Sequence, residues 1–339
     1  MTYYIIKRLL LVTIVLLIVT VITFSLTHLA PGDPAALWAG HRPTPEQVER
    51  ARIELGLDKP FVWRYAHYLG NLVQGDLGTA IRTRQPVIDE VLQYFPATFE
   101  LVTISLIISL IFGIPLGIIS AVRRETWVDH LSRTFSISGV SVPIFWLGMM
   151  LQLVFFSLIK ILPIQGRFSS EILIDNPVIS HTGLYLIDTL IEGNWTVFKS
   201  CLLHIILPAT TMSLASLAIV TRIARSAMIE VMQEDYIRTA EAYGIKENLI
   251  KYKYGLKNAL IPTITVVGVA YGFNLGGSVL VENIFDWPGI GRYIWFSIVH
   301  NDYPAIMGCT IVYAITYLLI NLIVDLAYVV IDPRIRYGK

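Results

Sequence analysis

The sequence predicts an all-α integral membrane protein with six transmembrane helices, and its composition and charge distribution carry this prediction. The chain has 339 residues, of which 55% are hydrophobic and only 15% are charged, whereas soluble proteins carry roughly 25% charged residues. Six stretches of 22 to 26 residues contain no Asp, Glu, Lys or Arg, and about 20 residues suffice for a helix to cross the hydrocarbon core of a bilayer. These stretches are 9–32, 101–122, 134–159, 200–221, 258–281 and 303–324.

The charges and cysteines exclude other classes of protein. Lys and Arg number 26 against 25 Asp and Glu, so the basic stripe of a nucleic-acid-binding protein is not expected. The two cysteines, Cys201 and Cys309, are too few for a disulfide framework or a four-ligand zinc site. Both lie in apolar runs, where we expect small buried side chains and no metal.

The distribution of Lys and Arg predicts that both termini lie in the cytoplasm. The first apolar stretch, 24 residues behind Lys7 and Arg8, is longer than the apolar core of a signal peptide, so we expect it to be a retained helix. With the N-terminus inside, the inner segments hold 15 Lys and Arg residues, and the outer segments hold 4 outside the long loop 33–99, which is too long to inform this rule. The loops 123–133 and 222–257 are then also cytoplasmic.

The long outer loop carries helix signals. Thr44, Pro45 and Gln47 form a capping box, which predicts a helix over 45–55 that ends at Gly56. Beyond it, an apolar and aromatic stripe recurs at a spacing of three to four residues and suits packing on the bilayer or on neighbouring spans. The stripe consists of Phe61, Tyr65, Tyr68, Leu69 and Leu72. Either a packed lid or a docking surface for an outer protein explains it.

Catalytic motifs are absent from the sequence. It contains no GxxxxGK[ST] phosphate loop, no HExxH and no GxSxG, so we do not expect an enzyme. His28 and His204 stand alone near outer span ends, where we expect interfacial roles, and Asp325 is expected to snorkel or pair near the inner end of the last span. Because an ion-driven carrier usually needs ionisable groups at the membrane midplane, the driving energy is expected to enter from elsewhere.

The inner segment 222–260 is the most informative part of the sequence. Acidic residues lead a helix after Glu234, and Gly244 closes it. A short second helix is predicted from Lys246 onward, followed by Pro262 at the opening of the fifth span. The segment is either an ordinary loop or a handle by which a soluble partner moves the spans.

This segment resembles the EAA-type coupling loop of ATP-binding-cassette importer permeases, in the form used by the dipeptide/oligopeptide/nickel permease family. The matching motifs extend along nearly the whole chain: Pro31–Pro34, Glu54–Pro60, Gly75–Gly78, Pro143–Trp146, Asp235–Ala240, Asn283–Arg292, Asp302–Pro304 and Asp332–Arg336. The length and the extended second outer loop resemble the dipeptide branch. Arg238-Thr239-Ala240 replaces Glu-Ala-Ala, and Tyr243 and Tyr254 stand where relatives often have Lys and His.

The resemblance implies a type I ABC importer permease fold and a set of partners. We expect an N-terminal transmembrane helix over 1–32, a helical extracytoplasmic loop over 33–99, a five-span core over 100–331 that includes the coupling loop 222–260, and a cytoplasmic tail over 332–339. The implied partners are a second homologous permease, two ATPase subunits and an extracytoplasmic substrate-binding protein. ATP and Mg would be bound by the ATPase subunits, and no cofactor by this chain.

The family also implies which residues meet the ATPase. The coupling set is Glu234, Asp235, Arg238, Thr239, Ala240, Glu241, Tyr243 and Gly244. In the fifth span, Gly268, Gly272 and Gly276 recur on one helix face, which indicates either close packing against another helix or the lining of a solute passage.

Three functional alternatives remain open at the level of sequence. The favoured function is the import of di- or oligopeptides, and the same family also offers nickel chelates, glutathione or oligosaccharides as substrates. An ion-coupled secondary transporter would work without ATPase partners. A membrane scaffold or receptor would bind partners without moving a solute.

Overall fold

The structure is a computed structural model that describes residues 2–29, 32–40 and 42–331, and in these ranges it is helical. It contains no strand there, only an isolated β-bridge between Thr79 and Pro86, which confirms the all-α prediction. The chain divides into two compact units: residues 1–97 with 288–318, and residues 98–287 with 319–339. Pro31 and the predicted tail 332–339 lie outside the described residues.

Five described helices are long and apolar enough to cross a membrane, and a bent helix pair supplies a sixth candidate span. The five are α1 (Thr2–Leu29), α5 (Val87–Val122), α10 (Trp195–Val231), α13 (Leu256–Ile284) and α15 (Tyr303–Ile331). Each overlaps one of the charge-free stretches of the sequence. Pro208 and Pro262 lie inside α10 and α13, as membrane helices tolerate.

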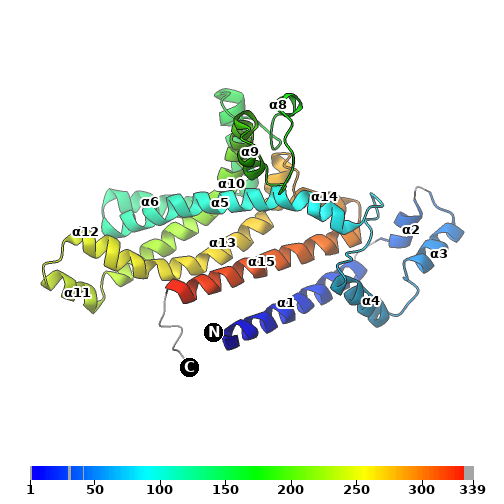
Figure 1. Cartoon of the computed structure of the whole chain (residues 1–339), viewed down its shortest axis with the longest axis horizontal. Helices are drawn as coiled ribbons and strands as arrows, with labels where there is room; N and C mark the ends of the chain where they lie inside the picture. Colours follow the sequence, from blue (N-terminus) through cyan, green and yellow to red (C-terminus); the bar gives the residue numbers. More distant parts are fainter. Residues whose placement is uncertain (1, 30–31, 41, 332–339) are drawn as a thin grey trace. The chain divides into compact units, whose positions relative to one another are not determined.

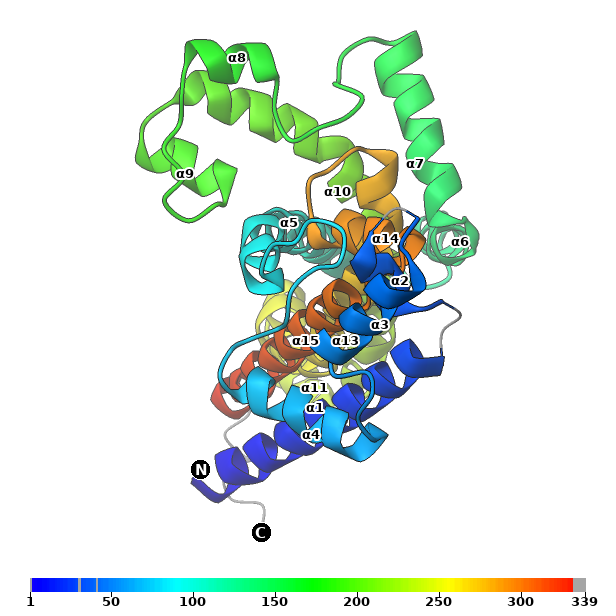
Figure 2. The same cartoon turned by 90° about the vertical axis from the view of Figure 1, so that its right-hand side faces the viewer.

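The third predicted span is broken. Helix α6 (Trp127–Ser141) and helix α7 (Ile144–Gln152), which continues into the π-helix η1 (Leu153–Leu158), meet at an angle of 103° (Figure 2). The cause is Pro143, which precedes α7 and holds Val142 in an extended conformation (φ −78°, ψ 125°). A single continuous helix over 134–159 was therefore the wrong prediction, although its apolar character was right.

In the first unit, three short helices follow α1. They are α2 (Pro34–Ala39), α3 (Pro45–Glu54) and α4 (Phe61–Val73). The predicted capping box at the start of α3 is confirmed: the Gln47 N–H donates to Thr44 Oγ1 at 3.3 Å, and the Thr44 N–H donates to Gln47 Oε1 at 2.8 Å. Gly56, at φ 64°, follows the end of this helix.

The aromatic stripe of α4 packs against α1. The Phe24 ring lies 5.3 to 5.4 Å, centroid to centroid, from the rings of Phe61, Tyr65 and Tyr68. The hydroxyls of Thr20 and Tyr65 are 2.9 Å apart. The stripe is thus a packing surface toward the first span.

The rest of the first unit surrounds a core built by the start of α5, helix α14 (Ile290–Val299) and the start of α15. Val87, Ile290 and Cys309 are fully buried there. Tyr293 donates a hydrogen bond to the Glu90 carboxylate, and burial raises the pKa of this phenol. Both cysteines are buried, as expected.

The second unit is centred on α10 and α13, which run side by side (Figure 1). A buried polar bridge joins them to α5: Ser216 donates to Asn274 Oδ1 at 2.6 Å, and Asn274 Nδ2 donates to Ser105 at 3.3 Å. Close approach of α5 and α10 depends on Gly117, where an added Cβ would lie 2.6 Å from the Thr221 carbonyl oxygen.

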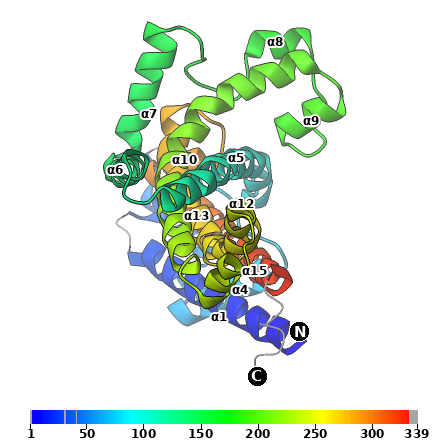
Figure 3. The same cartoon turned by 90° about the vertical axis from the view of Figure 1, so that its left-hand side faces the viewer.

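A second buried network holds the segment before α10. This segment contains α8 (Ser170–Asp175) and α9 (Tyr185–Ile191), which lie against α10 (Figure 3). Arg167 Nε donates to Glu100 Oε2 at 3.0 Å, and Arg167 Nη2 donates to the Gly183 carbonyl at 2.8 Å. Both charged side chains are 6% exposed. An ion pair therefore anchors the segment to the start of the second span.

We predict that Gly117→Ala destabilises the second unit, because the added methyl group cannot fit between α5 and α10. Overpacking of this kind typically costs about 1–3 kcal/mol. Gly70→Ala in α4 is the matched control, since a Cβ there meets nothing within 4 Å. Thermal unfolding of the purified chain in detergent measures the stability of both variants. Equal midpoints for wild type and Gly117→Ala would contradict the packing described here.

Candidate functional site

The candidate functional site is a compact helical knob, residues 232–255, between α10 and α13. It consists of α11 (Asp235–Ala242), α12 (Glu247–Leu249) and the π-helix η2 (Ile250–Gly255). Figure 1 shows the knob beyond one end of α10 and α13. Glu234 occupies the N-cap of α11, and Gly244 adopts φ 70° after its end, a conformation that glycine adopts without steric cost.

A small apolar core holds α11 in place. Ile237 is fully buried and Ile250 is 2% exposed, and both pack with Ala240. Met232 and Ile245 cover the edges of this cluster. The knob therefore has its own apolar core, which holds α11 in place and leaves the opposite face of this helix exposed.

Seven of the eight predicted coupling residues lie on the exposed surface of the knob. They are Glu234, Asp235, Arg238, Thr239, Glu241, Tyr243 and Gly244. Ala240 instead packs in the core of the knob, so the structure gives it a supporting position. Arg238 and Asp235 form an ion pair at 3.6 Å, with side chains 71% and 97% exposed, and such surface pairs contribute little stability.

Exposed aromatic side chains distinguish the knob from an ordinary polar loop. Tyr243 is 82% exposed and Tyr252 is 55% exposed. Tyr236 is 40% exposed, and its hydroxyl accepts a hydrogen bond from Asn258 Nδ2 at 2.7 Å. Large exposed aromatic side chains are typical of contact surfaces. Of these three tyrosines, only Tyr243 is among the predicted coupling residues.

The predicted boundary between knob and fifth span is wrong. Helical structure is continuous from Glu247 to Ile284, and Pro262 lies within α13 and does not open it. The π-helical turn η2 joins the short α12 directly to α13. A displacement of the knob would therefore act on α13 through unbroken helix.

At the base of the knob, Asp129 and Arg225 form a buried bidentate ion pair. Arg225 Nε and Nη2 donate to the two carboxylate oxygens of Asp129 at 2.6 and 2.7 Å. Ser120 Oγ and the Glu125 N–H also donate to this carboxylate, at 2.6 and 3.1 Å. Asp129 is fully buried. This ion pair, which we call the base clamp, joins α5, α6 and α10. It was not predicted from the sequence, because each of the two residues alone resembles an ordinary charged residue of a loop.

The glycines of α13 do not share one environment. Gly268 is buried, and an added Cβ would lie 2.3 Å from Asn321 Oδ1 of α15. Gly272 is partly buried. Gly276 is exposed, with nothing within 4 Å of an added Cβ. Close helix packing explains Gly268, whereas Gly276 leaves room for a partner helix or a solute.

The structure places two of the three other ionisable residues that the sequence analysis considered. His204 Nδ1 lies 2.7 Å from the Ser200 carbonyl oxygen, one helical turn earlier. Asp325 lies partly exposed in the last turns of α15. The side chain of His28 lies outside the described residues.

We predict that Ile237→Ala loosens the knob, because truncating a buried Ile typically costs about 2–5 kcal/mol. Hydrogen–deuterium exchange of the peptides that cover 232–250 should accelerate, while α5 and α10 keep their protection. Thr239→Ala, on the exposed face of the same helix, is the control and should exchange like wild type. Unchanged exchange in Ile237→Ala would show that this core does not hold α11.

Comparison with known proteins gives the family. The model of binding-protein-dependent transport system inner membrane components matches residues 113–337, and the model of the N-terminal region of such components matches residues 1–102. The chain is 49% identical over 320 residues to the probable D,D-dipeptide transport system permease protein DdpB of Escherichia coli K12, which covers 94% of this chain and 93% of that protein.

Two further relatives match over nearly the full length. Identity is 44% over 337 residues with the dipeptide transport system permease protein DppB of Alkalihalophilus pseudofirmus, covering 99% of this chain and 100% of that protein. It is 41% over 337 residues with the glutathione transport system permease protein GsiC of Pectobacterium atrosepticum, with the same coverage. The chain therefore belongs to the family of binding-protein-dependent transport system inner membrane components, the multi-pass membrane permeases that the resemblance of its motifs had indicated.

Proposed function

We propose that this chain is the permease subunit of an ATP-driven importer of di- or oligopeptides, and that it forms the translocation pathway with a second, homologous permease. The observation that carries the proposal is full-length similarity to permeases named for dipeptide transport. Similarity to a glutathione permease keeps that tripeptide as an alternative substrate. A substrate-binding protein on the outer side would deliver the peptide.

The knob is the proposed point of energy input. Two ATPase subunits bind ATP and Mg, and one of them receives the knob of this chain in a surface groove. Tyr243 and the charged residues of α11 are exposed for such a contact. This chain contributes neither nucleotide site nor cofactor.

The proposed motion passes from the knob to the spans by two routes. The first is the unbroken helix from Glu247 to Ile284, which moves when η2 moves. The second is α10, which the base clamp of Asp129 and Arg225 ties to α5 and α6. Closure of the ATPase pair would then shift several spans together and switch the pathway between inward-facing and outward-facing states.

The proposed orientation of the chain in the membrane follows from the binding of the ATPase subunits to the knob. If ATPase subunits bind the knob, it lies in the cytoplasm, and so do both termini. The long segment 33–99 then lies on the outer side. This agrees with the excess of Lys and Arg in the inner segments.

The experiment that tests the function is a pull-down of the tagged chain from native membranes in mild detergent, with measured subunit stoichiometry. We expect a second six-span protein and two ATPase chains. Glu241→Lys and Gly244→Trp should weaken ATPase recovery and peptide uptake at least tenfold, as expected when a contact worth about 1.4 kcal/mol or more is lost.

Glu54→Lys is the matched control, because Glu54 is an exposed carboxylate at the end of α3, in the other unit. It should leave ATPase recovery at the wild-type level. Full ATPase recovery and uptake with Glu241→Lys and Gly244→Trp would refute the role of the knob. Recovery of the chain alone, still moving peptide in ATP-free vesicles under an ion gradient, would identify a secondary carrier instead.

A further inference from the structure

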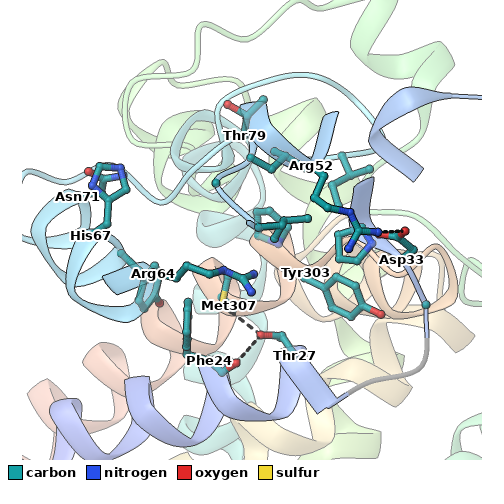
Figure 4. A pocket seen from close by; sticks show the side chains of 18 of the residues that line it. Phe24, Thr27, Asp33, Arg52, Arg64, His67, Asn71, Thr79, Tyr303 and Met307 are labelled. Atoms are coloured by element: carbon teal, nitrogen blue, oxygen red, sulfur yellow. Dashed lines mark hydrogen bonds and ion pairs between the residues drawn. The ribbon is translucent and has the colours of Figure 1, made fainter. Parts of the chain in front are cut away.

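The first unit contains a partly open cavity of about 460 Å³ that the coupling function does not use. It is bounded by the end of α1, by α3 and α4, and by the first turns of α15 (Figure 4). Apolar and aromatic side chains form much of its wall, among them Phe24, Trp63 and Ile81. The charged side chains on the wall are Asp33, Arg52 and Arg64.

The cavity wall carries cationic and hydrogen-bond donor groups without acceptors. The Arg64 guanidinium has no hydrogen-bond or ion-pair partner in the described part of the chain, and Figure 4 shows it reaching toward Thr27 and Met307. The Tyr68 hydroxyl is buried and also lacks a hydrogen-bond partner among the described residues. Arg52 Nε makes no hydrogen bond either, but it lies 3.7 Å from the Glu49 carboxylate. Arg52 Nη2 binds the Asp33 carboxylate at 2.7 Å, which leaves Arg64 as the uncompensated charge.

Arg64 and Tyr68 call for the same kind of ligand. A guanidinium has donors and no acceptor, and it stays charged at neutral pH although burial lowers the pKa of Arg64. Burial raises the pKa of Tyr68, so its phenol stays protonated and can donate. An anion with several acceptor oxygens complements this set, and arginine binds phosphate and carboxylate oxygens well.

Two span ends place the cavity at the level of the lipid headgroups. The charge-free stretches 9–32 and 303–324 are bounded by Asp33 and Asp302 at one end each, and Gly32, Asp33 and Tyr303 line the cavity. Charged residues that end an apolar stretch lie near the lipid headgroups, which places the cavity at the level of the phospholipid phosphates. This placement holds whichever side of the membrane the cavity faces.

Apolar side chains adjacent in sequence to the cavity-lining residues Thr27 and Trp63 are exposed, as contact with acyl chains requires. Leu26 of α1 is 61% exposed, and Val62 of α4 is 76% exposed. Helix α4 carries apolar and polar residues on different faces, as helices at a membrane interface do. A molecule seated in the cavity can therefore place a charged head beside Arg64 and a hydrocarbon tail beside α1 and α4.

We propose that this cavity binds the phosphate of a membrane phospholipid, with Arg64 as the principal ligand residue and Tyr68 as a further donor. A free phosphate ion shares the head chemistry but makes no contact with the apolar surface. The bound lipid fills the space between α1, α4 and α15 and fixes α4 on the first span. The site does not depend on the substrate of transport.

The test is native mass spectrometry of the full chain purified in mild detergent, with whichever subunits accompany it, titrated with dioleoylphosphatidylglycerol. Wild type should retain one lipid, and Arg64→Gln should need about tenfold more lipid, as expected for the loss of a charge-assisted hydrogen bond. Arg64→Lys should keep most of the binding. Arg50→Gln, an exposed arginine of α3 away from the cavity, should bind as wild type does.

Two probes separate the sources of the phosphate. Dioleoylglycerol, which has the same tails without the phosphate, should not be retained, and excess inorganic phosphate should not displace the phospholipid. Equal binding by wild type and Arg64→Gln, or retention of dioleoylglycerol as strong as that of the phospholipid, would overturn the proposal. Displacement by inorganic phosphate would show a soluble-anion site instead.

Tyr68→Phe keeps the proposal testable if Arg64→Gln fails to fold. This variant preserves the ring contact with Phe24 and removes only the hydroxyl. It should weaken lipid retention by a smaller factor at an unchanged melting temperature. Unchanged lipid retention by Tyr68→Phe would show that Tyr68 is not part of the site. If, in addition, Arg64→Lys retained the phospholipid no more strongly than dioleoylglycerol, the site itself would be refuted.

Discussion

The buried ion pair between Asp129 and Arg225 constrains the arrangement of the second unit. A fully buried carboxylate must be matched by donors, because an unpaired charge in a low-dielectric interior is strongly destabilising. Asp129 receives donors from Arg225 on α10, from Ser120 on α5 and from the Glu125 backbone. These contacts fix where α5, α6 and α10 meet. The knob begins directly after α10, so this ion pair fixes one of the two helices from which the knob projects.

The same rule governs two other carboxylates at the ends of charge-free stretches. Glu100 is paired with Arg167, and the fully buried Glu282 accepts a hydrogen bond from Thr98 at 2.7 Å. Each of these carboxylates lies directly beside a charge-free stretch, and in each case the partner comes from a distant part of the chain. Charges at span ends therefore hold helices together here as well as marking where the apolar stretches stop.

Structural features that depend on composition or on local signals were predicted well from the sequence, whereas pairing between distant residues was not. Charge-free stretches located the apolar helices, and the capping residues Thr44 and Gln47 located α3, because both signals are local. The break at Pro143 was missed because an apolar run is equally compatible with one helix or two. The exposed face of α11 was predictable from the motif, but the inward position of Ala240 depends on packing with Ile250. The pairing of Asp129 with Arg225 bridges 96 positions in sequence, which no periodicity can reveal.

The most direct test of this view of the molecule is a double-mutant cycle on the base clamp. Asp129→Asn, Arg225→Gln and the double variant would be compared with wild type by thermal unfolding in detergent and by peptide uptake with the partner subunits. Arg225→Gln should cost about 3–5 kcal/mol, because it leaves the fully buried Asp129 carboxylate unpaired. Asp129→Asn should cost less, because the Arg225 side chain is 22% exposed, and the double variant should be less impaired than the sum of the two. Strictly additive losses, or single variants as stable and active as wild type, would contradict the role of this ion pair in joining the knob to the spans.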